Sequence, residues 1–259
     1  MVVRSILCAL AAVALVLLLA KLTERRGSWD RDGDSAPDGP TAGHAGATMS
    51  ALFLLVFAIA VIVPWTAADS ARQNTHAEAQ SLVEAYWSAG LLPAGSRDTI
   101  RDGLRSYTAF VIDDEWPVMR DESRLTAEGW HRLDDFRGRL DALSFTDGAR
   151  KDALDDIRDQ VRDVYAARRQ RASDVEAALP SGVLFFTVLT GLAMIVLPFL
   201  LGARPQGRAL LPLALMAAML GVGVYLVFDI DHVFAGALGV APTAFQTAVA
   251  EFDRVPWAG

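Results

Sequence analysis

The stretch MSALFLLVFAIAVIVPWTAA, residues 49–68, contains no charged side chain. An α-helix of about 20 residues rises about 30 Å, which is the thickness of the hydrocarbon layer of a bilayer. A charged side chain at the centre of a membrane helix costs about 2.5–3.5 kcal/mol. In a chain in which 21% of the residues are charged, so long a gap predicts a transmembrane helix.

Three further apolar runs share this character. The run SILCALAAVALVLLLA, residues 5–20, predicts a transmembrane helix within residues 1–22, and later runs predict helices at 181–203 and 209–228. A signal peptide is the alternative for the first run, because it has a short basic start at Arg4. The sequence LLLAKLTERR that ends this run offers no A-x-A-like cleavage site, which favours a retained anchor. We therefore predict four spans.

The overall composition narrows the class of protein. Hydrophobic residues make up 53% of the 259 residues, so apolar and charged residues must be segregated along the chain. The formal net charge of -7 argues against a nucleic-acid partner. The one cysteine, Cys8, lies inside an apolar run, so an intrachain disulfide is excluded.

The links between the spans differ in length and composition. Residues 23–48 are rich in Gly, Asp, Pro, Ser and Ala and predict a flexible loop, whereas residues 204–208 predict a short turn. A long polar region, residues 69–180, separates the second span from the third. We expect the C-terminal segment, residues 229–259, to pack on this polar region.

The polar region has helical periodicity. Residues 69–90 are predicted to extend the second span as a helix that ends near Pro93. Ser96 is expected to cap the next helix, whose apolar residues lie on one face, and Pro117 is expected to end or kink it. A third helix should follow Thr126, and a fourth should follow the sequence FTDG. The predicted fold is all-α: a polytopic membrane protein with four transmembrane helices and a helical bundle inserted between the second and third spans.

Catalytic and metal-binding motifs are missing from the sequence. It contains no phosphate-binding glycine loop and no HExxH, CxxC, GxSxG or kinase signature. His76, His131 and His232 lie far apart and lack the paired spacing of metal ligands. The acidic runs are interpreted as a solvated face, because none of them resembles an EF-hand loop. We predict a protein that is not an enzyme and that has no metal or cofactor.

Four stretches carry recognisable motifs: HAEAQSLVEAY (76–86), LRSYTAFVIDDEWPVM (104–119), ARRQRASDVEAALP (167–180) and FDIDHVFAG…VAPTAF (228–245). Their order relative to the four spans resembles a bacterial family of four-span membrane proteins, the bestrophin-like domain family, a domain of unknown function. The resemblance runs from about Met49 to Phe252. It marks as family-motif residues Tyr107, Glu115, Trp116, Pro117, Arg168, Asp231, His232, Phe234, Gly236 and Pro242. The family usually reads DHPF after the fourth span, whereas Val233 stands at the proline position here.

A weaker resemblance links the DHPFxG segment to the PFG-containing segment of true bestrophins. Those proteins are pentameric anion channels whose second span lines the pore, so the analogy implies a homo-oligomer, as a pentamer, and anions as partners. Phe53, Phe57, Ala60 and Pro64 fall on one face of the second span and are the candidate pore-lining residues. The alternative for this face is ordinary contact with lipid or neighbouring helices.

Two interpretations stay open for the polar group Asp229, Asp231 and His232 that follows the fourth span. The first is a helix end at the water boundary, where charge is tolerated. The second places these residues at an oligomer interface or pore mouth. Their candidate partners are then Glu115, Trp116 and Arg168 or Arg169.

Two functions follow as hypotheses. The first is an integral membrane protein that forms an oligomeric bestrophin-like anion channel. The second is a non-conducting sensor or scaffold whose helical bundle binds a ligand or a partner. Both place the chain in the cell membrane as a multi-pass protein with the lipid bilayer as a partner. The side of the membrane that the bundle faces stays open. The basic residues of the short links favour links in the cytoplasm and a bundle outside, whereas the bestrophin analogy places the bundle inside.

Overall fold

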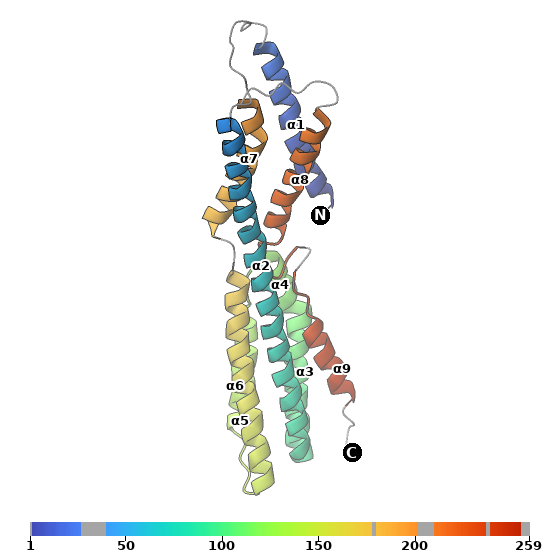
Figure 1. The fold of residues 1–259 in the computed structure, drawn as a ribbon. Coiled ribbons are helices and arrows are strands. Elements are labelled where there is room, and N and C mark those ends of the chain that lie inside the picture. The colour runs from blue at the N-terminus through green and yellow to red at the C-terminus, as the bar shows by residue number, and fades with distance from the viewer. Residues whose placement is uncertain (1, 27–39, 178–179, 201–209, 237–238, 255–259) are drawn as a thin grey trace. The chain divides into compact units, whose positions relative to one another are not determined.

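The computed structural model describes residues 2–26, 40–177, 180–200, 210–236 and 239–254. The chain forms two compact units, Met1–Trp65 with Ala178–Asp231, and Thr66–Ala177 with His232–Gly259. All regular secondary structure in the described residues is helical (Figure 1). The predicted all-α class is confirmed.

The first unit holds the four spans. They are α1 (Val2–Arg26), the first part of α2 (Pro40–Ser88), α7 (Ser181–Leu200) and α8 (Leu210–Asp229). Each has a stretch that is long and apolar enough to cross a membrane, which confirms the four predicted spans. Large apolar side chains remain exposed on every one of them, as lipid-facing helices require.

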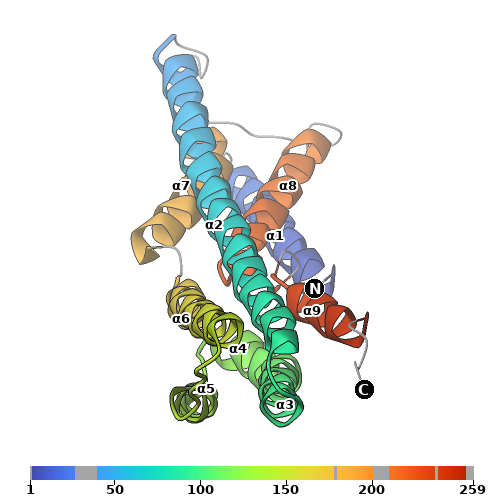
Figure 2. The same ribbon diagram turned by 90° about the horizontal axis from the view of Figure 1, so that it is seen from below.

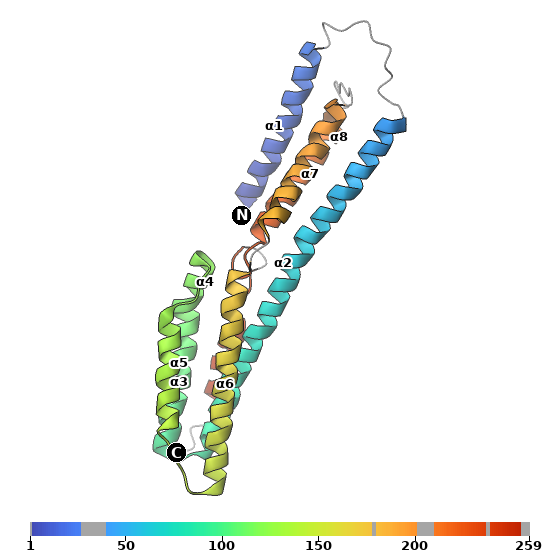
Figure 3. The same cartoon turned by 90° about the vertical axis from the view of Figure 1, so that its left-hand side faces the viewer.

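Close packing holds α1 against α8, which run side by side (Figure 3). A Cβ on Gly221 of α8 would lie only 2.7 Å from the carbonyl oxygen of Cys8 in α1. Small residues at such contacts let two membrane helices approach closely and gain van der Waals contact. Val16 of α1 and Ala217 of α8 are fully buried and belong to one apolar cluster.

Helix α2 is longer than predicted. It begins at Pro40 rather than at Met49, so the predicted flexible loop is helical from Pro40 onward, and its residues 27–39 lie outside the described part of the chain. Proline suits a first helical turn, because the N–H that it lacks would have no intrahelical partner there. The helix runs on to Ser88 with Pro64 in its interior, and Trp65 and Thr66 mark the change from the first unit to the second.

The second unit is a helical bundle seen end-on in Figure 2. Besides the second part of α2, it contains α3 (Ala94–Phe110), α4 (Trp116–Glu122), α5 (Ala127–Asp141), α6 (Gly148–Glu176) and α9 (Thr243–Arg254), with short turns at η1 (Ala89–Leu91) and η2 (Val111–Glu115). Phe245 and Phe252 of α9 are fully buried in the main apolar cluster of this unit. The C-terminal segment thus contributes core residues to the bundle.

The ends of the bundle helices follow local rules, with one difference from the prediction. Thr126 caps α5 by accepting a hydrogen bond from the Gly129 N–H, as expected. Ser96 does not cap α3, because the helix already begins at Ala94 and the Pro93 carbonyl accepts from the Arg97 N–H at 2.9 Å. Helix α6 ends at Glu176 and is a separate element from α7.

Pro117 changes the winding of the chain instead of ending the helix. It lies in the first turn of α4, directly after the π-helical turn η2. A proline in an α-helix loses one hydrogen bond and crowds the carbonyl four residues before it, and a wider π turn is one way to accommodate this. Glu115 and Trp116 are buried at this point, whereas Asp113 and Asp114 are exposed.

Candidate functional site: a buried network of ion pairs

Two arginines of α6 have no solvent-exposed surface. Arg168 and Arg171 lie one helical turn apart, and both side chains are 0% exposed. Arginine is almost never fully buried unless it is paired, because removing its charge from water is costly. Their partners therefore define the most unusual site in the described part of the bundle.

Arg168 pairs with Glu115 in a two-pronged contact. Its Nη1 and Nη2 atoms donate to the two carboxylate oxygens at 2.6 Å each. Nη1 also donates to the Tyr107 hydroxyl at 3.2 Å, and Nη2 donates to the carbonyl of Thr126 at 3.3 Å. The guanidinium lies 4.8 Å from the centre of the Trp130 ring. Four elements, α3, η2, α5 and α6, thus meet at one guanidinium.

Arg171 repeats the arrangement toward α2. Its Nε and Nη2 atoms donate to the two oxygens of Glu78 at 2.8 Å each, and Nη1 donates to Glu115 at 3.1 Å. The Tyr107 hydroxyl donates to Glu78 at 2.8 Å. Glu115 also accepts from the N–H and hydroxyl of Thr126. The result is one continuous network that joins α2, η2 and α6.

The network is balanced in charge. Two guanidinium groups face two carboxylates, and all four side chains are 0% exposed. Burial alone raises the pKa of the Glu115 carboxyl, but the hydrogen bonds from Arg168 and the charges of Arg171 and Arg168 outweigh it and hold this pKa below its usual value. Burial raises the pKa of Tyr107, and the charge of Glu78 raises it further. The Glu115 carboxylate is therefore charged and the Tyr107 phenol is neutral at neutral pH.

This balance predicts a dependence of stability on pH. Because the folded state lowers the pKa of Glu115 below its ordinary value of 4.5, the stabilisation is complete above that value and is lost as the pH falls through the folded pKa. Glu115→Gln should lower the thermal midpoint at pH 7 and flatten its decline below about pH 4.5. Thermal unfolding of both proteins in detergent, followed from pH 7 to pH 3, measures this. Equal slopes on the acid side would contradict the assignment.

The structure brings several predicted residues together and separates others. Tyr107, Glu115 and Arg168 share the network, and Pro117 lies directly beside it. Trp116 adds an edge-to-face contact with Phe234 at 5.5 Å. Its indole N–H donates to the carbonyl of Val240 at 3.3 Å, which ties the C-terminal segment to the bundle.

Sequence reasoning missed Glu78 and Arg171. A usable signal existed in the spacing of α6, where the buried positions Val161, Val164, Arg168, Arg171 and Val175 recur at intervals of three and four. An arginine at such a position lies on the buried face of the helix. A stripe defined by apolar residues alone passes over the two arginines that occupy buried positions of this face.

The polar group after α8 lies where the chain passes from the first unit to the second. Asp229 ends α8 and accepts a hydrogen bond from the Tyr225 hydroxyl, Asp231 is half-buried at the end of the first unit, and His232 is exposed in the second. Within the second unit, Glu115 and Arg168 pair with each other, and Arg169 is exposed.

The loop after His232 has a defined backbone. The carbonyl of Val233 accepts from the Val240 N–H at 2.9 Å, a bond that a proline at position 233 would also permit. Gly236 has a φ of 77°, in the left-handed region that favours glycine. Phe234 is buried by this turn, and Pro242 is half-buried just before α9.

The candidate pore-lining residues lie on the covered face of α2. Phe53 and Ala60 are 8% and 0% exposed, Pro64 is buried and Phe57 is half-buried. Cβ atoms on Gly191 of α7 and Gly223 of α8 would lie 3.5 Å and 3.0 Å from the rings of Phe53 and Phe57. In the single chain, this face therefore packs on α7 and α8, and its role in a pore stays a prediction.

The fold and the site define a class of protein: a four-span helical membrane protein whose extra-membrane bundle is held by buried ion pairs. The Bestrophin-like domain family matches residues 8–245, and the chain belongs to this family. No curated protein and no solved structure matches the chain. Among the described residues, no group of three or more His, Cys, Asp or Glu side chains could hold a metal ion.

Proposed function

We propose that this protein is a homo-oligomeric anion channel of the cell membrane. The observation that carries the proposal is the family match, which spans residues 8–245 and so reaches all four spans and the bundle. True bestrophins, to which the loop after α8 has a weaker resemblance, are pentameric anion channels. The corresponding assembly here is a ring of five copies, with α2 nearest to its axis.

The surface of α2 supports an assembly of copies in the membrane. Leu52, Leu55, Ile59 and Ile62 are between 44% and 58% exposed on its apolar part. Such a surface needs either lipid or neighbouring helices as its environment. A ring of copies would cover part of it and would leave the rest to lipid.

The proposed pore is lined by Phe53, Phe57, Ala60 and Pro64. A narrow ring of such apolar side chains would hold back water and ions until the pore widens. Phe57 is half-exposed, whereas the other three side chains are buried. It is therefore the side chain of this set that can line a pore with the least movement of α2. Opening the rest of the face requires α2 to separate from α7 and α8 near Gly191 and Gly223.

Chloride efflux from proteoliposomes tests the proposal. The wild-type chain should release chloride above the background of empty liposomes. Phe57→Ala should raise the rate by roughly an order of magnitude, because it removes part of an apolar constriction. Leu54→Ala is the matched control, since Leu54 is 63% exposed three residues away on the same helix. It should leave the rate unchanged.

The outcomes separate the alternatives. A changed chloride efflux rate in Leu54→Ala, together with a wild-type rate in Phe57→Ala, would indicate that the exposed face of α2 lines the pore. An absence of chloride flux at every pH and voltage, together with a monomer or dimer in mild detergent, would contradict the channel.

A non-conducting sensor or scaffold is the second candidate. One observation favours it: the predicted pore-lining face of α2 is covered by α7 and α8 of the same chain. In this function the bundle would bind a ligand or partner, and the spans would serve as an anchor. Oligomeric state and flux, measured on the same preparation, decide between the two.

A further inference from the structure

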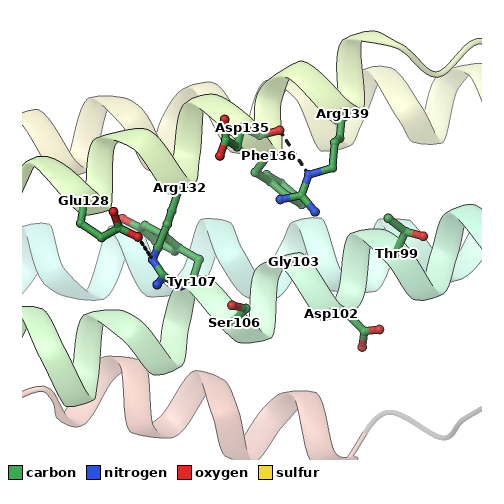
Figure 4. A pocket seen from close by; sticks show the side chains of 10 residues that line it. All are labelled: Thr99, Asp102, Gly103, Ser106, Tyr107, Glu128, Arg132, Asp135, Phe136 and Arg139. Carbon is green, nitrogen blue, oxygen red and sulfur yellow. Dashed lines mark hydrogen bonds and ion pairs between the residues drawn. The ribbon is translucent and has the colours of Figure 1, made fainter.

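Helices α3 and α5 border a cavity of about 590 Å³ in the bundle (Figure 4). Its size falls within the range of roughly 300–1,000 Å³ that is common for small-molecule sites. Thr99 and Ser106 place hydroxyl groups on the α3 wall. Gly103 brings this wall close to α5, because a Cβ there would lie 2.7 Å from the ring of Phe136.

A second cavity of about 290 Å³ adjoins the first and has a different character. The two share Thr99, Phe136 and Arg139 in their walls. The aliphatic lining of the smaller cavity comes from Ile100, Leu140 and Leu143. A polar space thus passes into an apolar one, with Arg139 where the two meet.

Two guanidinium groups reach from α5 toward α3, those of Arg132 and Arg139 (Figure 4). Arg132 is paired, because its Nε donates to Glu128 at 2.8 Å. The Nε of Arg139 donates to a carbonyl of its own helix, that of Asp135, at 3.3 Å. Among the residues that the structure describes, Arg139 has no carboxylate within 4.0 Å. Arg139 is therefore the cation that remains open to an anionic ligand.

The acidic residues of the larger cavity limit the charge of that ligand. Asp102, Glu128 and Asp135 line it. Glu128 is neutralised by Arg132, and the Asp102 carboxylate points away from α5 in Figure 4. A dianionic head such as a phosphate monoester would be repelled by this surrounding charge. A monocarboxylate needs only one guanidinium, which can bind it with two parallel hydrogen bonds.

From these features we infer that the α3–α5 cavities bind a monocarboxylate that carries a short hydrocarbon chain. Its carboxylate pairs with Arg139, and its chain enters the space beside Leu140 and Leu143. Tyr107 also lines the larger cavity, and its hydroxyl belongs to the buried ion network. The inference does not depend on whether the chain conducts ions.

Calorimetric titration of the full chain in lipid nanodiscs with sodium hexanoate tests this inference. Saturable binding is expected after subtraction of the heat from empty nanodiscs. Arg139→Gln should weaken it about tenfold, because charge-assisted hydrogen bonds to the carboxylate are lost. Arg137→Gln is the matched control: it makes the same change on the same helix, at a side chain 57% exposed, and should keep the wild-type affinity.

Other probes of the wild-type protein test the charge and the chain separately. Acetate, which lacks the chain, should bind at least about tenfold more weakly than hexanoate. Hexylammonium and hexyl phosphate should also bind more weakly than hexanoate. The inference is overturned by an absence of saturable hexanoate binding, by equal binding in Arg139→Gln, or by tighter binding of hexylammonium or hexyl phosphate. Circular dichroism of Arg139→Gln, an exposed position, should match that of the wild type.

Discussion

Replacing Arg171 with methionine is expected to lower the free energy of unfolding of the bundle by about 3–5 kcal/mol. The change removes both guanidinium hydrogen bonds to Glu78 and one to Glu115. It leaves one excess negative charge among side chains that are 0% exposed. A buried charge without a partner is far less favourable than a buried pair. Thermal unfolding in detergent, followed by tryptophan fluorescence, measures the loss, because Trp116 and Trp130 flank the two guanidinium groups.

Two further variants separate charge from packing. Arg169→Met makes the same change at the exposed neighbouring position and should leave the thermal midpoint within a few degrees of the wild type. The double variant Glu78→Leu with Arg171→Met removes a whole ion pair, so it should recover most of the loss seen in the single variant. If the double variant is as unstable as Arg171→Met, the charge argument is wrong and lost packing explains the result.

Adding a single methyl group at Gly129 should also lower the free energy of unfolding of the bundle. A Cβ at this buried position of α5 would overlap the Arg168 guanidinium and lie 2.7 Å from the Glu115 carboxylate. Neither group can move away without breaking the contact between them. Gly129→Ala is therefore expected to destabilise the bundle by about 1–3 kcal/mol, the usual range for overpacking a core. The same thermal unfolding assay measures it.

Gly138→Ala supplies the matched control for this change. Gly138 lies on the same helix, and a Cβ there would meet no atom within 4 Å. Alanine is a better helix former than glycine, so this variant should be stabilised by about 0.5–1 kcal/mol. Changes in unfolding free energy of opposite sign for Gly129→Ala and Gly138→Ala support the steric argument, whereas equal stabilisation of both variants would refute it.

The charge pattern of the sequence was sufficient to predict the spans. Stretches such as residues 49–68 lack charge because lipid excludes it, and this cause acts locally along the chain. The start of α2 was less predictable, because the glycine- and alanine-rich residues after Pro40 suit either a loop or a helix. Thr126 shows the reverse case, since a side chain that caps its own helix can be recognised from its neighbours alone.

The sequence by itself thus determined the all-α class and the four spans, and the family resemblance named Tyr107, Glu115 and Arg168 among its motif residues. Only the tertiary structure decided that Arg168 and Arg171 share Glu115, and that Glu78, 93 positions away from Arg171, completes the network. The physical reason is the range of the forces involved. Exclusion of charge from lipid depends on composition within one helix, whereas an ion pair depends on which distant side chains the packed helices bring within a few ångströms.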